Sequence, residues 1–96
     1  MASIDSKGVQ IYYEDFGSGT PIVFVHGLGI DRRIFNYQVE ALKDKFRLVT
    51  FDLRGHGKSD APETGYSYSH FAEDLKNLIE HLDLKDFHLV GLSMGG

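Results

Sequence analysis

Apolar residues fall along the chain in two kinds of pattern. Residues 22–25, 48–51 and 87–90 form short runs that are almost continuously apolar, which is typical of strands buried on both faces of a parallel sheet. Over residues 34–45 and 68–82, apolar positions instead recur at helical spacing, which predicts amphipathic helices. The order strand, helix, strand, helix, strand predicts two right-handed crossover units, and therefore a parallel βαβαβ sheet with flanking helices.

Two more strands are expected before this unit. Residues 2–5 and 9–16 flank residues 6–8, which end in a glycine that suits the tight turn of a hairpin. In the second of these segments apolar and polar positions alternate, which is the period of a sheet with one covered face. Ser67 or Ser69 is expected to cap the start of the second helix. The fold class is therefore α/β.

The composition limits the kinds of partner and ligand that we expect. The chain has 96 residues, of which 42% are hydrophobic and 25% charged, so we expect one globular domain over residues 1–96. Its net charge is -4, with Lys and Arg scattered, which argues against nucleic acid or an anionic membrane as a partner. There is no secretory pattern at the start and no cysteine, which fits the cytoplasm. The histidines show no close pairing with a carboxylate, so neither a metal nor a cofactor is expected.

The candidate chemistry lies where the three buried strands end. In open parallel sheets, ligands bind at the carboxyl ends of the strands. Each of these strands is followed by a glycine-rich segment: His-Gly-Leu-Gly at 26–29, Asp-Leu-Arg-Gly-His-Gly-Lys-Ser at 52–59, and Gly-Leu-Ser-Met-Gly-Gly at 91–96. We therefore expect the functional site at this edge of the sheet.

The third segment is a G-x-S-x-G sequence. Ser93 stands between Gly91 and Gly95, a spacing that lets a strand and a following helix approach closely around a strained turn. Such a turn lifts the serine hydroxyl clear of the sheet and aims the next backbone N–H, that of Met94, at a substrate carbonyl oxygen. A second N–H must come from another loop. The glycines on either side of Leu28 leave that backbone free to approach a ligand, so its N–H is the natural candidate.

The three motifs in this order resemble the N-terminal part of an α/β-hydrolase-fold serine hydrolase, and the resemblance spans essentially the whole chain. It implies that Ser93 is the nucleophile and that the Leu28 and Met94 amides form the oxyanion hole. It also implies that His26 and Gly27 shape this hole. The supporting glycines would be Gly29, Gly91 and Gly95, and a loop of mainly architectural role would contain Asp52, Arg54, Gly55, Gly57 and Ser59.

The motifs also bear on the type of reaction. Epoxide hydrolases and haloalkane dehalogenases of similar layout carry aspartate at the nucleophile position, so Ser93 disfavours them. The remaining pattern is similar to carboxylesterases, enol-lactonases, cofactor-free haloperoxidases and carbon–carbon bond hydrolases. The resemblance therefore implies a small-molecule ester or lactone as substrate.

Two readings of the chain stay open. Enzymes of this fold take the acid and the histidine of the triad from positions after the serine, and the chain stops at the nucleophile elbow, so we expect it to be inactive alone. The alternative is a non-catalytic half-domain that self-associates into a homo-oligomer through the bare edge of the strand at residues 87–92.

Several polar and aromatic residues have ordinary structural explanations. We expect His26 to have a structural role in its loop and His56 to be a hydrogen-bonded turn residue. For Asp52, we expect an ion pair with Arg54 or bonds to nearby backbone N–H groups. Phe35 and Tyr37 either border an acyl pocket or pack within the core and helix.

Overall fold

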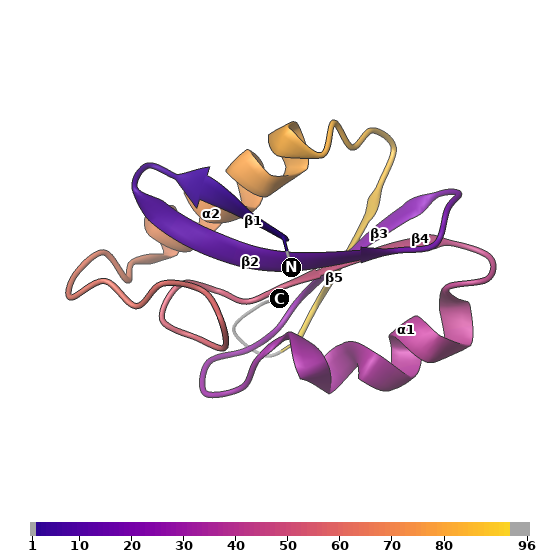
Figure 1. Ribbon diagram of the computed structural model, residues 1–96, viewed down its shortest axis with the longest axis horizontal. Helices are drawn as coiled ribbons and strands as arrows, with labels where there is room; N and C mark the ends of the chain where they lie inside the picture. Colours follow the sequence, from indigo (N-terminus) through magenta and orange to yellow (C-terminus); the bar gives the residue numbers. More distant parts are fainter. Residues whose placement is uncertain (1, 93–96) are drawn as a thin grey trace.

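The computed structural model describes residues 2–92 as a five-stranded sheet with one α-helix against each face (Figure 1). The sheet order is β1-β2-β4-β3-β5. In chain order the elements are β1 (Ala2–Ser6), β2 (Val9–Phe16), β3 (Pro21–Val25), the 3₁₀ helix η1 (Arg32–Phe35), α1 (Asn36–Leu42), β4 (Arg47–Phe51), α2 (Tyr68–His81) and β5 (His88–Gly91).

The leading hairpin is confirmed. Ser6 pairs with Val9 across β1 and β2, so the turn consists of Lys7 and Gly8 alone. Both have positive φ, 49° and 91°, as the two central residues of the favoured two-residue hairpin turn require. β2 then pairs antiparallel with β4, which joins the hairpin to the rest of the sheet.

The two crossover units are also confirmed. β3 pairs parallel with β4 on one side and with β5 on the other, and each connection carries a helix. Successive side chains of β3 point to opposite faces. Val23 and Val25 therefore pack in the core beneath α2, together with Leu78, whereas Phe24 packs beneath α1.

The first helix differs from the expectation for residues 34–45. It begins as η1, where the carboxylate of Asp31 accepts a hydrogen bond from the Arg33 N–H, and the α-helical part ends at Leu42. The second helix begins at Tyr68, with the Ser67 side chain accepting from the His70 N–H. Ser67, of the two candidates, is thus the cap. No helix in residues 2–92 is long and apolar enough to cross a membrane.

The expectation that the third apolar run is buried on both faces is wrong. All four residues of β5 are exposed, and Leu89 and Val90 retain 52% and 41% of their accessible surface. β5 stands at the end of the sheet order and pairs only with β3 among the described strands. α2 packs against β1, which stands at the opposite end of the strand order from β5. An apolar strand is buried only where a neighbour covers it, and that neighbour is not encoded in the strand.

Candidate active site

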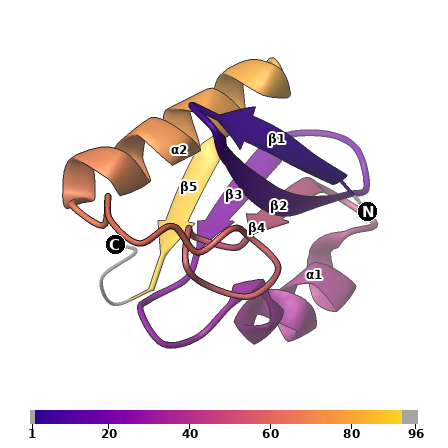
Figure 2. The ribbon, with the colours of Figure 1, turned by 60° about the vertical axis from the view of Figure 1, so that its left-hand side comes forward.

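The ends of β3 and β5 meet at one edge of the sheet. The Leu92 N–H, just after β5, donates to the carbonyl of Val25, the last residue of β3, at 3.1 Å. Figure 2 shows β3 and β5 running toward the same edge, where the loops after β3 and β4 lie close together. We call residues 26–29 the first loop and residues 52–59 the second loop.

His26 holds the start of the first loop. Its side chain is fully buried. Its Nδ1 lies 2.7 Å from the Gly27 carbonyl, and its Nε2 accepts a hydrogen bond from the Leu53 N–H at 3.0 Å. A carbonyl can only accept, so the proton of the neutral ring sits on Nδ1. Burial lowers the pKa of His26, which favours this neutral form.

His56 contacts the end of the same loop. Its Nε2 accepts a hydrogen bond from the Gly29 N–H at 3.2 Å, and its Nδ1 lies 3.0 Å from the Arg54 carbonyl. The His26 and His56 rings are 5.2 Å apart between centroids. Gly29 has a φ of +81°, a region that favours glycine. Between the two histidine contacts lies Leu28, whose side chain is 59% exposed.

Asp52 organises the second loop, but its ion-pair partner is Arg32 rather than Arg54. Its fully buried carboxylate accepts from Arg32 Nη1 at 2.7 Å and from the Arg32 N–H at 2.9 Å. It also accepts from the Lys58 N–H at 2.9 Å. The expected bonds to backbone N–H groups are therefore present. A Cβ on Gly57 would collide with this carboxylate, which explains a glycine there.

The side chain of Arg54 forms its ion pair with α2. Its Nε and Nη2 donate to the two carboxylate oxygens of Asp74 at 2.7 and 2.8 Å, and these hydrogen bonds raise the pKa of Arg54. Ser6 Oγ donates to the same carboxylate at 2.5 Å. The pairing of Asp74 with Arg54 was missed from the sequence. The available signal was a carboxylate on the apolar stripe of α2, between Phe71 and Leu78.

Ser59 ties the second loop to the hairpin. Its hydroxyl donates to the Asp52 carbonyl at 2.6 Å and accepts from the Tyr12 N–H of β2 at 2.8 Å. Gly55 has a φ of +79°, and a Cβ there would lie 2.7 Å from the Tyr66 ring, which would have to shift. These contacts hold the second loop against β2. They thereby also hold the Leu53 N–H and the His56 ring, which contact the first loop.

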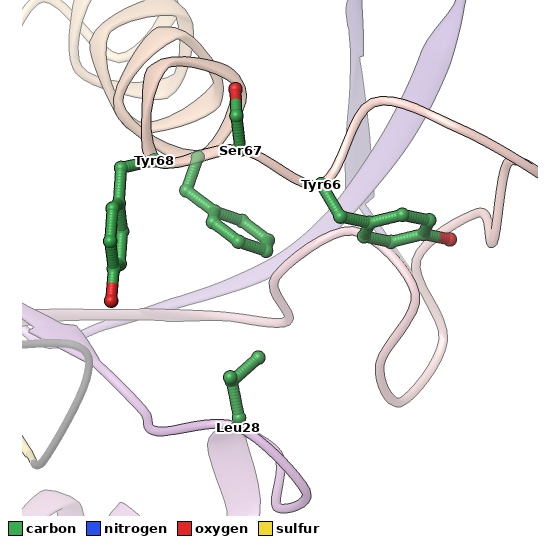
Figure 3. Close-up of a pocket in the computed structure, with 5 residues that line it drawn as sticks. Leu28, Tyr66, Ser67 and Tyr68 are labelled. Atoms are coloured by element: carbon green, nitrogen blue, oxygen red, sulfur yellow. The ribbon is translucent and has the colours of Figure 1, made fainter.

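A cavity of about 450 Å³ adjoins Leu28. Its other lining residues are Tyr66, Ser67, Tyr68 and Phe71, at the start of α2 (Figure 3). Phe35 and Tyr37 do not line it: Phe35 packs on Phe24 with ring centroids 4.8 Å apart, and Tyr37 is 89% exposed.

The remaining site residues lie at the end of the chain. Gly91 is the last residue of β5. The expectations for Ser93, Met94 and Gly95 concern residues outside the described part of the chain. Within residues 2–92, no group of three or more His, Asp or Glu side chains is placed to hold a metal ion.

Comparison with known proteins identifies the family. The sequence model of the alpha/beta hydrolase fold matches residues 20–96. The chain belongs to the α/β-hydrolase family. The expected fold class is thereby confirmed, and the first two glycine-rich segments directly follow β3 and β4.

Several relatives in this family are close in sequence. The AB hydrolase superfamily protein YisY of Bacillus subtilis is 45% identical over 89 residues, covering 92% of this chain and 33% of its own. A putative non-heme chloroperoxidase of Synechocystis is 45% identical over 92 residues, covering 95% and 33%. The 3-oxoadipate enol-lactonase 1 of Acinetobacter baylyi is 41% identical over 75 residues, covering 78% and 28%.

Solved structures agree with this placement. An esterase from Exiguobacterium antarcticum superposes with a TM-score of 0.94 at 43% identity, covering 97% of this chain and 35% of its own. A bromoperoxidase from Bacillus anthracis superposes with a TM-score of 0.95 at 45% identity, covering 99% and 36%. The chain thus spans about a third of the length of the relatives that it matches.

Proposed function

We propose that this chain is the N-terminal segment of a serine hydrolase that cleaves carboxylic ester or lactone bonds through an acyl-enzyme on Ser93. In this proposal the Leu28 and Met94 N–H groups form the oxyanion hole. The observation that carries it is the hydrogen bond from the Leu92 N–H to the Val25 carbonyl. The residue before Ser93 therefore lies against the residue before His26, and both motifs leave the sheet at the same place.

The proposed reaction follows from the groups that meet there. The Ser93 oxygen attacks the substrate carbonyl carbon while its proton passes to a general base, and the carbonyl oxygen takes up negative charge as the tetrahedral intermediate forms. Backbone N–H groups already aimed at this oxygen stabilise it, and removing one such donor typically lowers kcat by about 10²–10³. Collapse of the intermediate breaks the bond to the alcohol oxygen, which takes up the proton from the base, and leaves an ester on Ser93, which water then hydrolyses to the acid.

The family resemblance assigns the triad acid and histidine to positions after Ser93. Loss of the general base typically costs about 10⁴–10⁶ in turnover. Neither His26 nor His56 is arranged for that role, because both ring nitrogens of each contact backbone groups. We therefore propose that the 96-residue chain has no esterase activity by itself.

The substrate class is supported by the relatives and by the cavity. One related structure is named as an esterase and one relative as an enol-lactonase. The cavity beside Leu28 is lined mainly by aromatic and aliphatic side chains. Such a lining suits the apolar part of a small ester or lactone.

The test compares two proteins with a matched variant. The product of the longest reading frame containing this sequence, and the 96-residue chain, are each assayed with p-nitrophenyl acetate and with a simple lactone. We expect turnover by the longer product, loss of that turnover in Ser93→Ala, and no turnover by the short chain. Hydrolysis by the short chain that disappears in Ser93→Ala would refute the proposed need for later residues. Hydrolysis by the longer product that survives Ser93→Ala would refute the nucleophile.

The exposed edge of the sheet supports the second proposal, self-association of the chain on its own. Leu89, Val90 and Leu92 retain 52%, 41% and 43% of their accessible surface, and an exposed apolar edge strand is a template for pairing with another chain. We expect light scattering at about 10 µM to show an oligomer of the 96-residue chain, with Val90→Lys shifting it to monomer. A wild-type monomer at that concentration would contradict self-association.

A further inference from the structure

The first and second loops are joined by a reciprocal pair of histidine contacts. His26 in the first loop accepts the Leu53 N–H of the second loop at 3.0 Å. His56 in the second loop accepts the Gly29 N–H of the first loop at 3.2 Å. In each ring the acceptor is Nε2, while Nδ1 faces a carbonyl of the same loop. The two rings use the same tautomer, because a carbonyl can only accept a hydrogen bond.

These contacts hold both peptide groups that flank the Leu28 Cα. The carbonyl of Gly27 and the N–H of Leu28 belong to one trans peptide and point in opposite directions. His26 Nδ1–H donates to that carbonyl, so it orients the Leu28 N–H away from its own ring. The N–H of Gly29 belongs to the next peptide, and His56 accepts it. The backbone on both sides of Leu28 is therefore fixed by a histidine.

We propose that His56 is a positioning residue for the Leu28 N–H. It acts through Gly29: by accepting that N–H, it fixes the peptide after Leu28 and so keeps Leu28 in place, while the contact of His26 with Gly27 orients the Leu28 N–H itself. The inference rests on the proposed function, in which this N–H stabilises the oxyanion. It assigns His56 a role beyond that of a hydrogen-bonded residue of its own turn.

The local backbone explains why such a contact is needed. The first loop has glycine on both sides of Leu28, and Gly29 stands at a φ of +81°. A Cβ built on Gly29 meets nothing within 4 Å among the described residues, so that side of the residue is open. Glycine backbones have the widest conformational freedom. The hydrogen bond to His56 therefore restrains a part of the loop that has much backbone freedom.

The two ring nitrogens of His56 have separable roles. Nδ1 faces the Arg54 carbonyl and serves the turn of the second loop, whereas Nε2 serves the first loop. An Asn side chain places its amide near the Nδ1 position and does not reach Gly29. A Gln side chain places its carbonyl oxygen near the Nε2 position and can accept the Gly29 N–H. His56→Asn and His56→Gln therefore separate the two functions.

The experiment measures kinetics and amide exchange on the same variants. Esterase kinetics use p-nitrophenyl acetate and the product of the longest reading frame containing this sequence. Hydrogen exchange at Gly29 is followed by NMR on the same protein. His81→Asn is the matched control, because His81 is an exposed residue at the end of α2. Thermal unfolding checks that each variant is folded at the assay temperature.

We expect His56→Asn to lower kcat by about 10-fold or more, up to the loss of about 10²–10³ that outright removal of an oxyanion donor causes. KM should change less than twofold, because the contact acts mainly on the transition state. Exchange at Gly29 should accelerate in His56→Asn. His56→Gln should recover most of kcat and of the Gly29 protection, and His81→Asn should match the wild type.

The outcomes distinguish this inference from the proposed function. An active wild type whose His56→Asn variant keeps kcat within twofold overturns the inference and leaves the hydrolase function in place. Equal losses in His56→Asn and His56→Gln, with unchanged Gly29 exchange, also overturn it, because the effect would then come from the turn. A wild type without hydrolase activity refutes the proposed function, and the inference with it.

Discussion

The buried contact between Arg54 and Asp74 offers a sharp test of what holds the second loop in place. The relative exposures of these side chains are 7% and 0%, and their closest approach is 2.7 Å. Asp74 also accepts from Ser6 Oγ, which in turn accepts from Asn77 Nδ2 at 2.9 Å. One carboxylate therefore joins the second loop, α2 and the hairpin.

Replacing Asp74 with Asn keeps the shape and removes the charge. Arg54 then stays buried without a countercharge, its acceptors being the Gly65 carbonyl and the single Asn carbonyl oxygen. The Asn NH₂ group replaces the other oxygen and faces a donor of Arg54 or Ser6. Breaking a buried pair on one side costs about 3–5 kcal/mol, a large share of the roughly 5–15 kcal/mol that stabilises a typical domain. With an m-value of about 1.5 kcal/mol/M, a loss of ~3 kcal/mol lowers the urea midpoint by ~2 M.

The assay is urea unfolding of the 96-residue chain, followed by far-ultraviolet circular dichroism. The control is Glu80→Gln, the same chemical change on the same helix, where the pair with Lys76 spans 3.9 Å and both side chains are mostly exposed. That change should alter the free energy of unfolding by less than about 0.5 kcal/mol. A loss below about 1 kcal/mol for Asp74→Asn would refute the reasoning.

Three further predictions concern stability. Gly57→Ala should cost more than Gly8→Ala in urea unfolding, because both glycines have positive φ but only at Gly57 would a Cβ collide, with the Asp52 carboxylate; equal losses would contradict this. Ser67→Ala should lower the stability of the chain by about 1 kcal/mol through loss of the α2 cap, measured against Ser69→Ala, and equal effects would show that the cap is elsewhere. Burial lowers the pKa of His26 below 6.5 in the folded chain, so the unfolded chain takes up more protons as pH falls below 6.5, and stability should decrease over that window. In His26→Gln this pH dependence should be weaker, and an unchanged slope would contradict the assignment.

Local pattern was sufficient for most of the elements. The hairpin follows from a glycine turn and from the alternation in β2, and the strands β3 and β4 follow from nearly continuous apolar runs, which match their two covered faces. The cap of α2 is a local feature as well, since Ser67 bonds to a backbone group three residues away. In each case the pattern that predicts the element lies within a few residues along the chain.

The failures concern long-range partners. Asp52 and Arg54 are two residues apart, and an ion pair between them was a reasonable expectation, yet each bonds a residue 20 positions away. Those partners come from η1 and α2, and only the folded arrangement brings them together. The expected burial of β5 was wrong for the same reason, because the burial of a strand depends on what packs against it. The role inferred for His56 likewise required the distance to Gly29.

The most direct test of the proposed chemistry is active-site labelling of Ser93. The product of the longest reading frame containing this sequence is treated with a fluorophosphonate, which transfers its phosphonyl group to an activated serine hydroxyl and releases fluoride. Peptide mass mapping then locates the modified residue. We predict one modified site, Ser93, with labelling abolished in Ser93→Ala and absent from the 96-residue chain. Labelling of a different serine, with undiminished hydrolysis in Ser93→Ala, would contradict the claim that Ser93 is the nucleophile.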